Sequence, residues 1–91
     1  MLQFEWDRDK ELINIEKHGV DFDTAIKAFS DPNCRIVEDS RHSEYEERHF
    51  CVGRVGNRIL TVRFMYRESK IRIFGAGYWR GGNALYEKKK K

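Results

Sequence analysis

The spacing of apolar residues separates a helical beginning of the chain from a strand-rich remainder. Phe22, Ala25, Ile26 and Phe29 follow one another at intervals of three and four residues, which is the spacing of one buried helical face. From Cys34 onward apolar and polar residues alternate, as they do in strands with one buried side. The pattern therefore predicts an α+β fold in which helices precede most of the sheet.

Two helices are predicted in the first thirty residues, and residues with cap preferences set their limits. The first covers residues 7–18, with Asp7 as its N-cap and Gly19 in the left-handed position after its last turn. The second covers residues 22–30 and ends before Pro32. The first helix has a ragged apolar side, formed by Leu12, Ile13 and Ile15.

Five strands are predicted, over residues 3–6, 35–38, 47–55, 58–66 and 70–76. Turn residues separate the last three strands, which form an antiparallel meander. A consistent pairing of these strands needs a three-residue loop in the first hairpin and a four-residue loop in the second. We expect two N-terminal helices packed on one face of an antiparallel sheet and a short C-terminal helical segment. We also expect a single domain over residues 1–87 with a basic tail over 88–91.

The alternation also assigns side chains to the two faces of the sheet. The predicted core face carries Phe50, Val52, Leu60, Val62, Phe64, Ile71 and Ile73. The predicted open face carries His49, Cys51, Thr61, Arg63, Met65, Arg72 and Phe74. Because successive strand residues point to opposite faces, a shift of one residue in any strand exchanges its two sets.

Charge changes this picture because it is sorted along the chain. Residues 1–47 hold thirteen acidic and six basic residues, whereas residues 48–91 hold two acidic and twelve basic ones. Most cations of the second half are arginines, whose planar guanidinium groups match phosphate oxygens in pairs. The sorting favours a surface for a polyanion, and a merely solvated basic face is the alternative.

Cysteine usage and hydropathy indicate where the protein works. Cys34 and Cys51 lack the spacing of metal ligands, and we expect them to be packed thiols. The sequence has no apolar run of about 18 residues, and its N-terminus has no signal-peptide pattern. The expectation is a cytoplasmic protein with no membrane partner.

Several short motifs resemble the opening of the BrnT-type toxins. They are Phe4-Glu5-Trp6-Asp7, Lys10, Asn14, Lys17-His18-Gly19-Val20, Asp31-Pro32, Glu46-Glu47-Arg48 and Ile71-Arg72-Ile73. The resemblance implies a RelE/ParE-like fold and a ribonuclease toxin of a type II toxin–antitoxin system that inhibits translation. It also implies a BrnA-type antitoxin as partner, whose DNA-binding half provides the only link to DNA.

The chain departs from that family after the last of these motifs. The family commonly continues with Ser, Ala and Arg and then a basic helix, and Gly77 occupies the usual arginine position here. Arg80 is a candidate substitute for the missing cation. The departure leaves a second function open, in which a toxin-fold module of little or no activity binds RNA or a protein partner.

The candidate catalytic residues follow from the chemistry of RNA cleavage by the 2′-hydroxyl. That reaction needs a base, an acid and cations that stabilise the pentacovalent phosphorane. Arg48, Arg63 and Arg72 are the candidates for the cations, with Arg80 as a fourth. His49 is a candidate acid or base, because histidine titrates near neutral pH. The carboxylates have no ligand-like spacing, so neither a metal nor another cofactor is expected.

His18 is a second candidate acid or base, with stabilisation of the helix dipole as the alternative role. Candidate contacts to RNA are Lys17, Arg54, Tyr66, Phe74 and Trp79. Trp79 has no apolar stripe to join, so it either stacks on a base or packs against the antitoxin.

Overall fold

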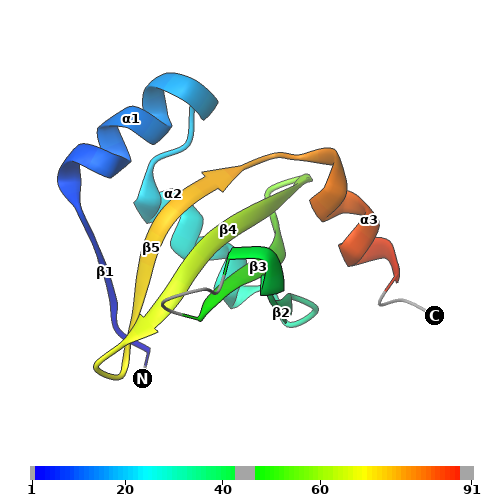
Figure 1. Ribbon diagram of the computed structural model, residues 1–91. Coiled ribbons are helices and arrows are strands. Elements are labelled where there is room, and N and C mark those ends of the chain that lie inside the picture. Colours follow the sequence, from blue (N-terminus) through cyan, green and yellow to red (C-terminus); the bar gives the residue numbers. More distant parts are fainter. Residues whose placement is uncertain (1, 43–46, 89–91) are drawn as a thin grey trace.

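The computed structural model describes residues 2–42 and 47–88 of the chain. The elements in order are β1 (Phe4–Trp6), α1 (Arg8–His18), α2 (Phe22–Ile26), the 3₁₀ turn η1 (Lys27–Ser30), β2 (Arg35–Glu38), η2 (Ser40–His42), β3 (Arg48–Val55), β4 (Arg58–Arg67), β5 (Lys70–Gly77) and α3 (Arg80–Lys88). All predicted helices and strands are present, and their limits lie close to the predicted ones (Figure 1). Residues 89–91 of the predicted basic tail lie outside the described residues, as do residues 43–46.

One five-stranded sheet with the order β1-β5-β4-β3-β2 forms the centre of the fold. The prediction of an antiparallel sheet is wrong for β1, which pairs parallel to β5 through Phe4↔Ile71 and Trp6↔Ile73. The other neighbouring strands are antiparallel. A parallel partner for β1 is possible because α1 and the elements that follow carry the chain away before β5 returns beside it. The sheet is therefore mixed.

Both hairpins close with two-residue turns, not with the longer loops that the alternation required. Val55 pairs with Arg58 around Gly56-Asn57, and Arg67 pairs with Lys70 around Glu68-Ser69. Gly56 has a φ of 64°, whereas Glu68 and Ser69 have φ values of 52° and 67°. Positive φ values are typical of tight hairpin turns, since their twist matches that of the strands. The turn lengths set the register of β3 against β4.

This register corrects the predicted faces of β3. His49 pairs with Phe64 and Cys51 with Val62, so both lie on the core face and not on the open face. Burial accordingly raises the pKa of the Cys51 thiol. Phe50 and Val52, which were predicted for the core face, lie on the opposite face beside Arg63 and Thr61.

The faces of β4 and β5 agree with the prediction. Leu60, Val62, Phe64, Ile71 and Ile73 are buried in the main core, and Arg63, Met65, Arg72 and Phe74 lie on the other side. The register shifts between Arg63 and Phe64, as it does in a β-bulge. Met65 pairs with Arg72, and Arg63 pairs with Gly75. Phe74 lies between those two pairs.

Helix α2 and the turn η1 cover the core face, as predicted, whereas α1 packs against β5 and also borders the face that carries Arg63. Asp7 accepts hydrogen bonds from the N–H groups of Asp9 and Lys10 and so caps α1, and Gly19 ends it with a φ of 70°. Asp21 caps α2 by accepting a hydrogen bond from the N–H of Thr24. Hydrogen bonds with the side chain and the backbone of Thr24 lower the pKa of the Asp21 carboxyl. Phe22, Ala25 and Ala28 are fully buried against the sheet.

The inward side of α1 is polar, contrary to the predicted apolar side. Glu11 and Asn14 are 2% and 7% exposed, whereas Leu12 and Ile13 are 49% and 51% exposed. Glu11 accepts hydrogen bonds from Trp6 Nε1 and from the N–H of Phe22. These polar side chains hold α1 in place because they satisfy buried donors and acceptors of the neighbouring segments.

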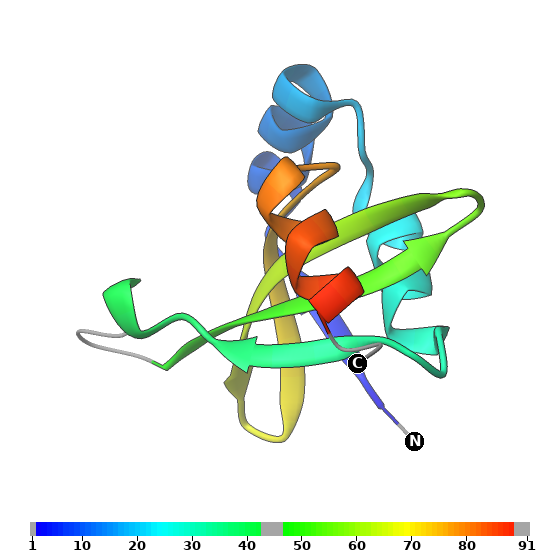
Figure 2. The ribbon, with the colours of Figure 1, turned by 90° about the vertical axis from the view of Figure 1, so that its right-hand side faces the viewer.

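Helix α3 packs on the face of the sheet opposite α2 (Figure 2). It begins at Arg80 and corresponds to the predicted C-terminal helical segment. Tyr86 is buried with Val52 and Ile59 in a second apolar cluster. Residue 82 lies where α3 packs tightly against the sheet. It has to be glycine there, because a Cβ at this position would overlap Thr61 Oγ1. No helix among the described residues is long and apolar enough to cross a membrane.

Candidate functional site

The part of the open face that α3 leaves uncovered is centred on Arg63. Its guanidinium carbon lies 5.4 Å from the ring centre of Phe74 and 5.7 Å from that of Trp79. The guanidinium crosses β5 at Gly75, where a Cβ would lie 3.0 Å from Arg63 Nε. Glycine at that position therefore lets the arginine lie flat over the neighbouring strand. Among the described residues no carboxylate forms an ion pair with Arg63.

A small hollow of about 150 Å³ lies between α1 and this arginine. Lys10, Lys17 and His18 line it from α1, and Arg63 and Phe74 line it from the sheet. Ile13 and Asn14 complete the lining. Three of the lining residues, Lys10, Lys17 and Arg63, carry positive charge. Clustered cations with donor groups suit an anion such as a phosphate group.

Trp79 forms the boundary between this hollow and α3. Its ring meets the His18 ring edge-to-face at a centroid distance of 5.1 Å. The indole also covers Gly77, since a Cβ there would lie 2.5 Å from Trp79 Cε2. A larger residue at position 77 would displace the indole. The position of Trp79 therefore depends on glycine at position 77, the residue that departs from the predicted family pattern.

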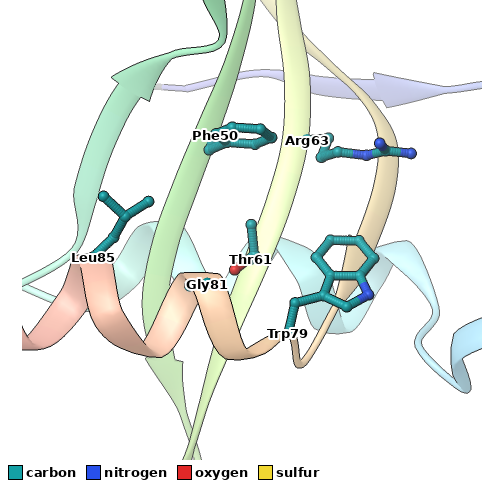
Figure 3. Close-up of a pocket in the computed structure, with 7 residues that line it drawn as sticks. Phe50, Thr61, Arg63, Trp79, Gly81 and Leu85 are labelled. Atoms are coloured by element: carbon teal, nitrogen blue, oxygen red, sulfur yellow. The ribbon is translucent and has the colours of Figure 1, made fainter.

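An apolar pocket of about 320 Å³ opens on the other side of Arg63 (Figure 3). The lining residues are Phe50, Thr61, Arg63, Trp79, Gly81, Gly82 and Leu85. The sequence prediction missed Phe50 as a site residue because it placed Phe50 in the core. It put Thr61 on the open face without assigning it to the site, and it did not single out Leu85. The signal that was present is the pair Gly56-Asn57, which favours a two-residue turn and hence this register.

Arg48 and Arg72 lie on the same face as Arg63. The sequence predicted this face for Arg72 only, and Arg48 reaches it because the corrected register of β3 pairs it with Met65. The guanidinium carbon of Arg48 lies 5.0 Å from the Phe74 ring centre, so Arg48 and Arg63 share this ring. Arg72 Nη1 lies 3.3 Å from Glu5 Oε2, and this ion pair offsets its charge. The sequence did not reveal the pair, because Glu5 comes beside Arg72 only through the parallel pairing of β1 with β5.

His49 and Tyr66 lie apart from the arginines, on the core face. The His49 ring stacks on Phe64 at 5.5 Å and meets Tyr66 at 5.2 Å. His49 Nδ1 is buried and has no hydrogen-bond partner among the described residues. The structure thus does not bring His49 to the face that carries Arg63.

Arg54 and Arg80 lie outside the Arg63 group. The Arg54 guanidinium lies 5.7 Å from the Tyr86 ring centre, and the N–H of Arg54 donates to Asp31 Oδ2 at 2.7 Å. Arg80 is the exposed first residue of α3 and lines neither the hollow nor the apolar pocket. Of the predicted residues, the structure brings together Lys17, His18, Arg48, Arg63, Phe74 and Trp79.

A cationic hollow bordered by partly exposed aromatic rings on a basic α+β domain is typical of proteins that act on nucleic acids. Residues 6–81 match the family described as ribonuclease toxin, BrnT, of type II toxin–antitoxin systems. The match covers most of the chain, so the chain belongs to this family and the resemblance is confirmed. Membership brings ribonuclease activity, an RNA target and an antitoxin partner. No curated protein matches the chain.

Proposed function

We propose that this protein cleaves RNA at the Arg63 group without a metal ion. The observation that carries the proposal is the convergence of Arg63 with Lys10, Lys17 and His18 around one hollow. A phosphate bound there would sit among cations that also stabilise the added charge of the phosphorane. The attacking group would be the RNA 2′-hydroxyl.

The roles of the individual residues follow from their places. Arg63 is the main phosphate ligand, because it faces the hollow and lacks an ion-pair partner among the described residues. His18 is the acid or base, since it is the histidine that lines the hollow. Arg48 supports Arg63 across the Phe74 ring.

Metal independence is supported by the charge of the site. Cations repel a divalent metal, and within the described ranges no three His, Cys, Asp or Glu side chains gather so as to hold one. We further propose that cleavage inhibits translation in the cytoplasm and that a BrnA-type antitoxin neutralises it. A RelE/ParE-like fold remains part of the same prediction.

The experiment compares two exposed arginines of β4 in RNA cleavage by the purified protein in EDTA. Arg63→Ala should lower the cleavage rate on the order of a hundredfold, as loss of one electrostatic stabiliser does. Arg58→Ala is the matched control. The guanidinium carbon of Arg58 lies 3.8 Å from the ring centre of Tyr78, and Arg58 does not line the hollow. Both variants should keep their stability within about 0.5 kcal/mol.

The alternative is a module that binds RNA or a partner with little cleavage. It is favoured by Gly77, where the family commonly has arginine. Wild-type protein that is folded but leaves RNA intact, and that does not slow growth when expressed alone, would establish this alternative and exclude the catalytic role of Arg63.

A further inference from the structure

The apolar pocket and the cationic hollow lie next to each other and share Arg63. Arg63 lines both, and Trp79 stands between them, with one ring contact to Arg63 and another to His18. A ligand that fills both spaces needs an anionic part on one side of Arg63 and an apolar, flat part on the other. A nucleotide has this composition.

From this geometry we infer that the pocket binds one unpaired nucleobase of the RNA whose phosphate occupies the hollow. The inference rests on the proposed function and extends it to a base-binding subsite. Phe50 and Trp79 provide aromatic surfaces (Figure 3). All four RNA bases can stack on such rings, because each has an aromatic face. A volume of about 320 Å³ falls in the range of pockets that hold small organic ligands.

Thr61 provides an independent sign that the occupant has a polar edge. It is 5% exposed, and its Oγ1 has no hydrogen-bond partner among the described residues. Figure 3 shows the hydroxyl directed toward α3. Rotation about the Cα–Cβ bond would turn it into the pocket, where a base edge supplies the missing partner. An aliphatic side chain of a protein partner would leave it unsatisfied.

The pocket also implies a preference for RNA structure. A base within a duplex is stacked and paired, so it cannot enter a pocket between α3 and the sheet without leaving the helix. Single-stranded RNA meets no such cost. The protein should therefore bind and cut unpaired segments and spare the same sequence in a duplex.

The first test is an NMR titration of the full-length protein with the four ribonucleoside 3′-monophosphates, with ribose phosphate and inorganic phosphate as base-free probes. All probes should shift the resonances of Lys17 and His18. Only the nucleotides should also shift the backbone amides of Gly81, Gly82 and Leu85. Equal shifts from nucleotides and base-free phosphates would overturn the inference.

Two variants test the walls of the pocket. Phe50→Leu keeps an apolar side chain but removes the ring, and it should weaken nucleotide binding about fivefold or more. Tyr78→Leu removes a ring outside the pocket and should leave nucleotide affinity unchanged. Thr61→Val keeps the shape of the side chain and removes the hydroxyl. It should therefore lower the affinity most for the nucleotide that binds wild-type protein most tightly. Equal nucleotide affinity in Phe50→Leu and Tyr78→Leu would refute the stacking role.

The outcomes separate this inference from the proposed function. Selective shifts at the pocket without RNA cleavage would contradict the catalytic proposal and leave the base subsite standing. RNA cleavage without selective shifts would do the reverse. If nucleotides cause no resonance shifts at the pocket but the antitoxin does, the pocket belongs to the protein partner and the inference is overturned.

Discussion

Asn14 joins α1 to two other segments through three buried hydrogen bonds. Its Nδ2 donates to the carbonyls of Val20 and Ala76, each at 2.9 Å, and its Oδ1 accepts from the N–H of Ala76 at 3.2 Å. This amide secures the end of β5 from which the chain continues to Trp79. Hydropathy did not predict this role, because a pattern of apolar residues contains no information on hydrogen-bond geometry.

Asn14→Ala should lower the free energy of unfolding by about 2–4 kcal/mol, because it leaves buried backbone groups of Val20 and Ala76 without partners. Leu12→Ala is the control on the same helix. It removes a larger apolar side chain from an exposed position and should change stability by at most about 0.5 kcal/mol. Urea denaturation measures both, and a larger loss in Leu12→Ala would show that the exposed side of α1 is the stabilising one.

The elements themselves were predictable, and their relative placement was only partly so. The caps at Asp7 and Gly19 act locally, so the limits of α1 followed from sequence. The face of β3 depends on whether the turn at Gly56-Asn57 has two or three residues, and one residue exchanges His49 and Phe50 between faces. The prediction chose the longer loop to place Phe50 in the core, and the tight turn overrode that preference.

Two neighbouring glycines of α3 test how closely this helix must approach the sheet. A Cβ at Gly81 meets nothing within 4 Å, whereas one at Gly82 overlaps Thr61. Gly81→Ala should be neutral or stabilise by up to about 1 kcal/mol, since alanine favours helix. Gly82→Ala should destabilise by about 1–3 kcal/mol through overpacking. Thermal unfolding of the pair measures the difference, and equal effects would mean that α3 is not held against Thr61.

The far end of α3 is attached through Asp31, which gives the attachment a pH dependence. The Tyr86 hydroxyl donates to Asp31 Oδ2 at 2.6 Å. Desolvation opposes the charge on Asp31, but hydrogen bonds from Tyr86 and from the N–H groups of Arg54 and Asn33 outweigh it and lower its pKa. A lowered pKa in the folded state stabilises the fold above the unfolded-state pKa of about 4, and this contribution disappears as pH falls through the folded-state value.

Asp31→Asn should therefore be less stable than wild type at pH 6, because the neutral amide is a weaker acceptor for the Tyr86 hydroxyl. The gap in the free energy of unfolding should narrow as the pH falls from about 4 through the lowered pKa of Asp31, where the wild-type carboxylate also becomes neutral. Urea denaturation at pH 6 and pH 2.5 measures the gap. A gap of the same size at both values would contradict the assigned charge on Asp31.

For the molecule as a whole, the sequence predicted the kind of site better than it predicted which residues form it. The sorted charge and the alternation of β4 and β5 were enough to place Arg63, Arg72 and Phe74 on one face. The ion pair of Arg72 with Glu5 and the approach of His18 to Trp79 join residues from opposite ends of the chain. Such long-range contacts depend on how the elements pack and leave no local pattern.

The basic face predicts a strong salt dependence of RNA binding. Each phosphate contact contributes about −0.7 to the slope of log affinity against log salt for single strands. Four engaged cations, namely Arg48, Arg63, Lys10 and Lys17, should give a slope near −3 by that relation. Arg63→Ala should make the slope less steep by about 0.7, and Arg58→Ala should leave it unchanged. Fluorescence anisotropy at several salt concentrations measures it, and a wild-type slope near zero would exclude phosphate contacts.

The parallel pairing of β1 with β5 has a consequence for the synthesis of the toxin. Phe4 and Trp6 are synthesised well before their partners Ile71 and Ile73. A contact between distant parts of a chain cannot form before the later part exists, and such contacts slow folding. Because β1 and α1 dock on β5, His18 and Lys17 take their places beside Arg63 only after β5 has been synthesised. A nascent chain that still lacks β5 therefore lacks the cationic hollow around Arg63.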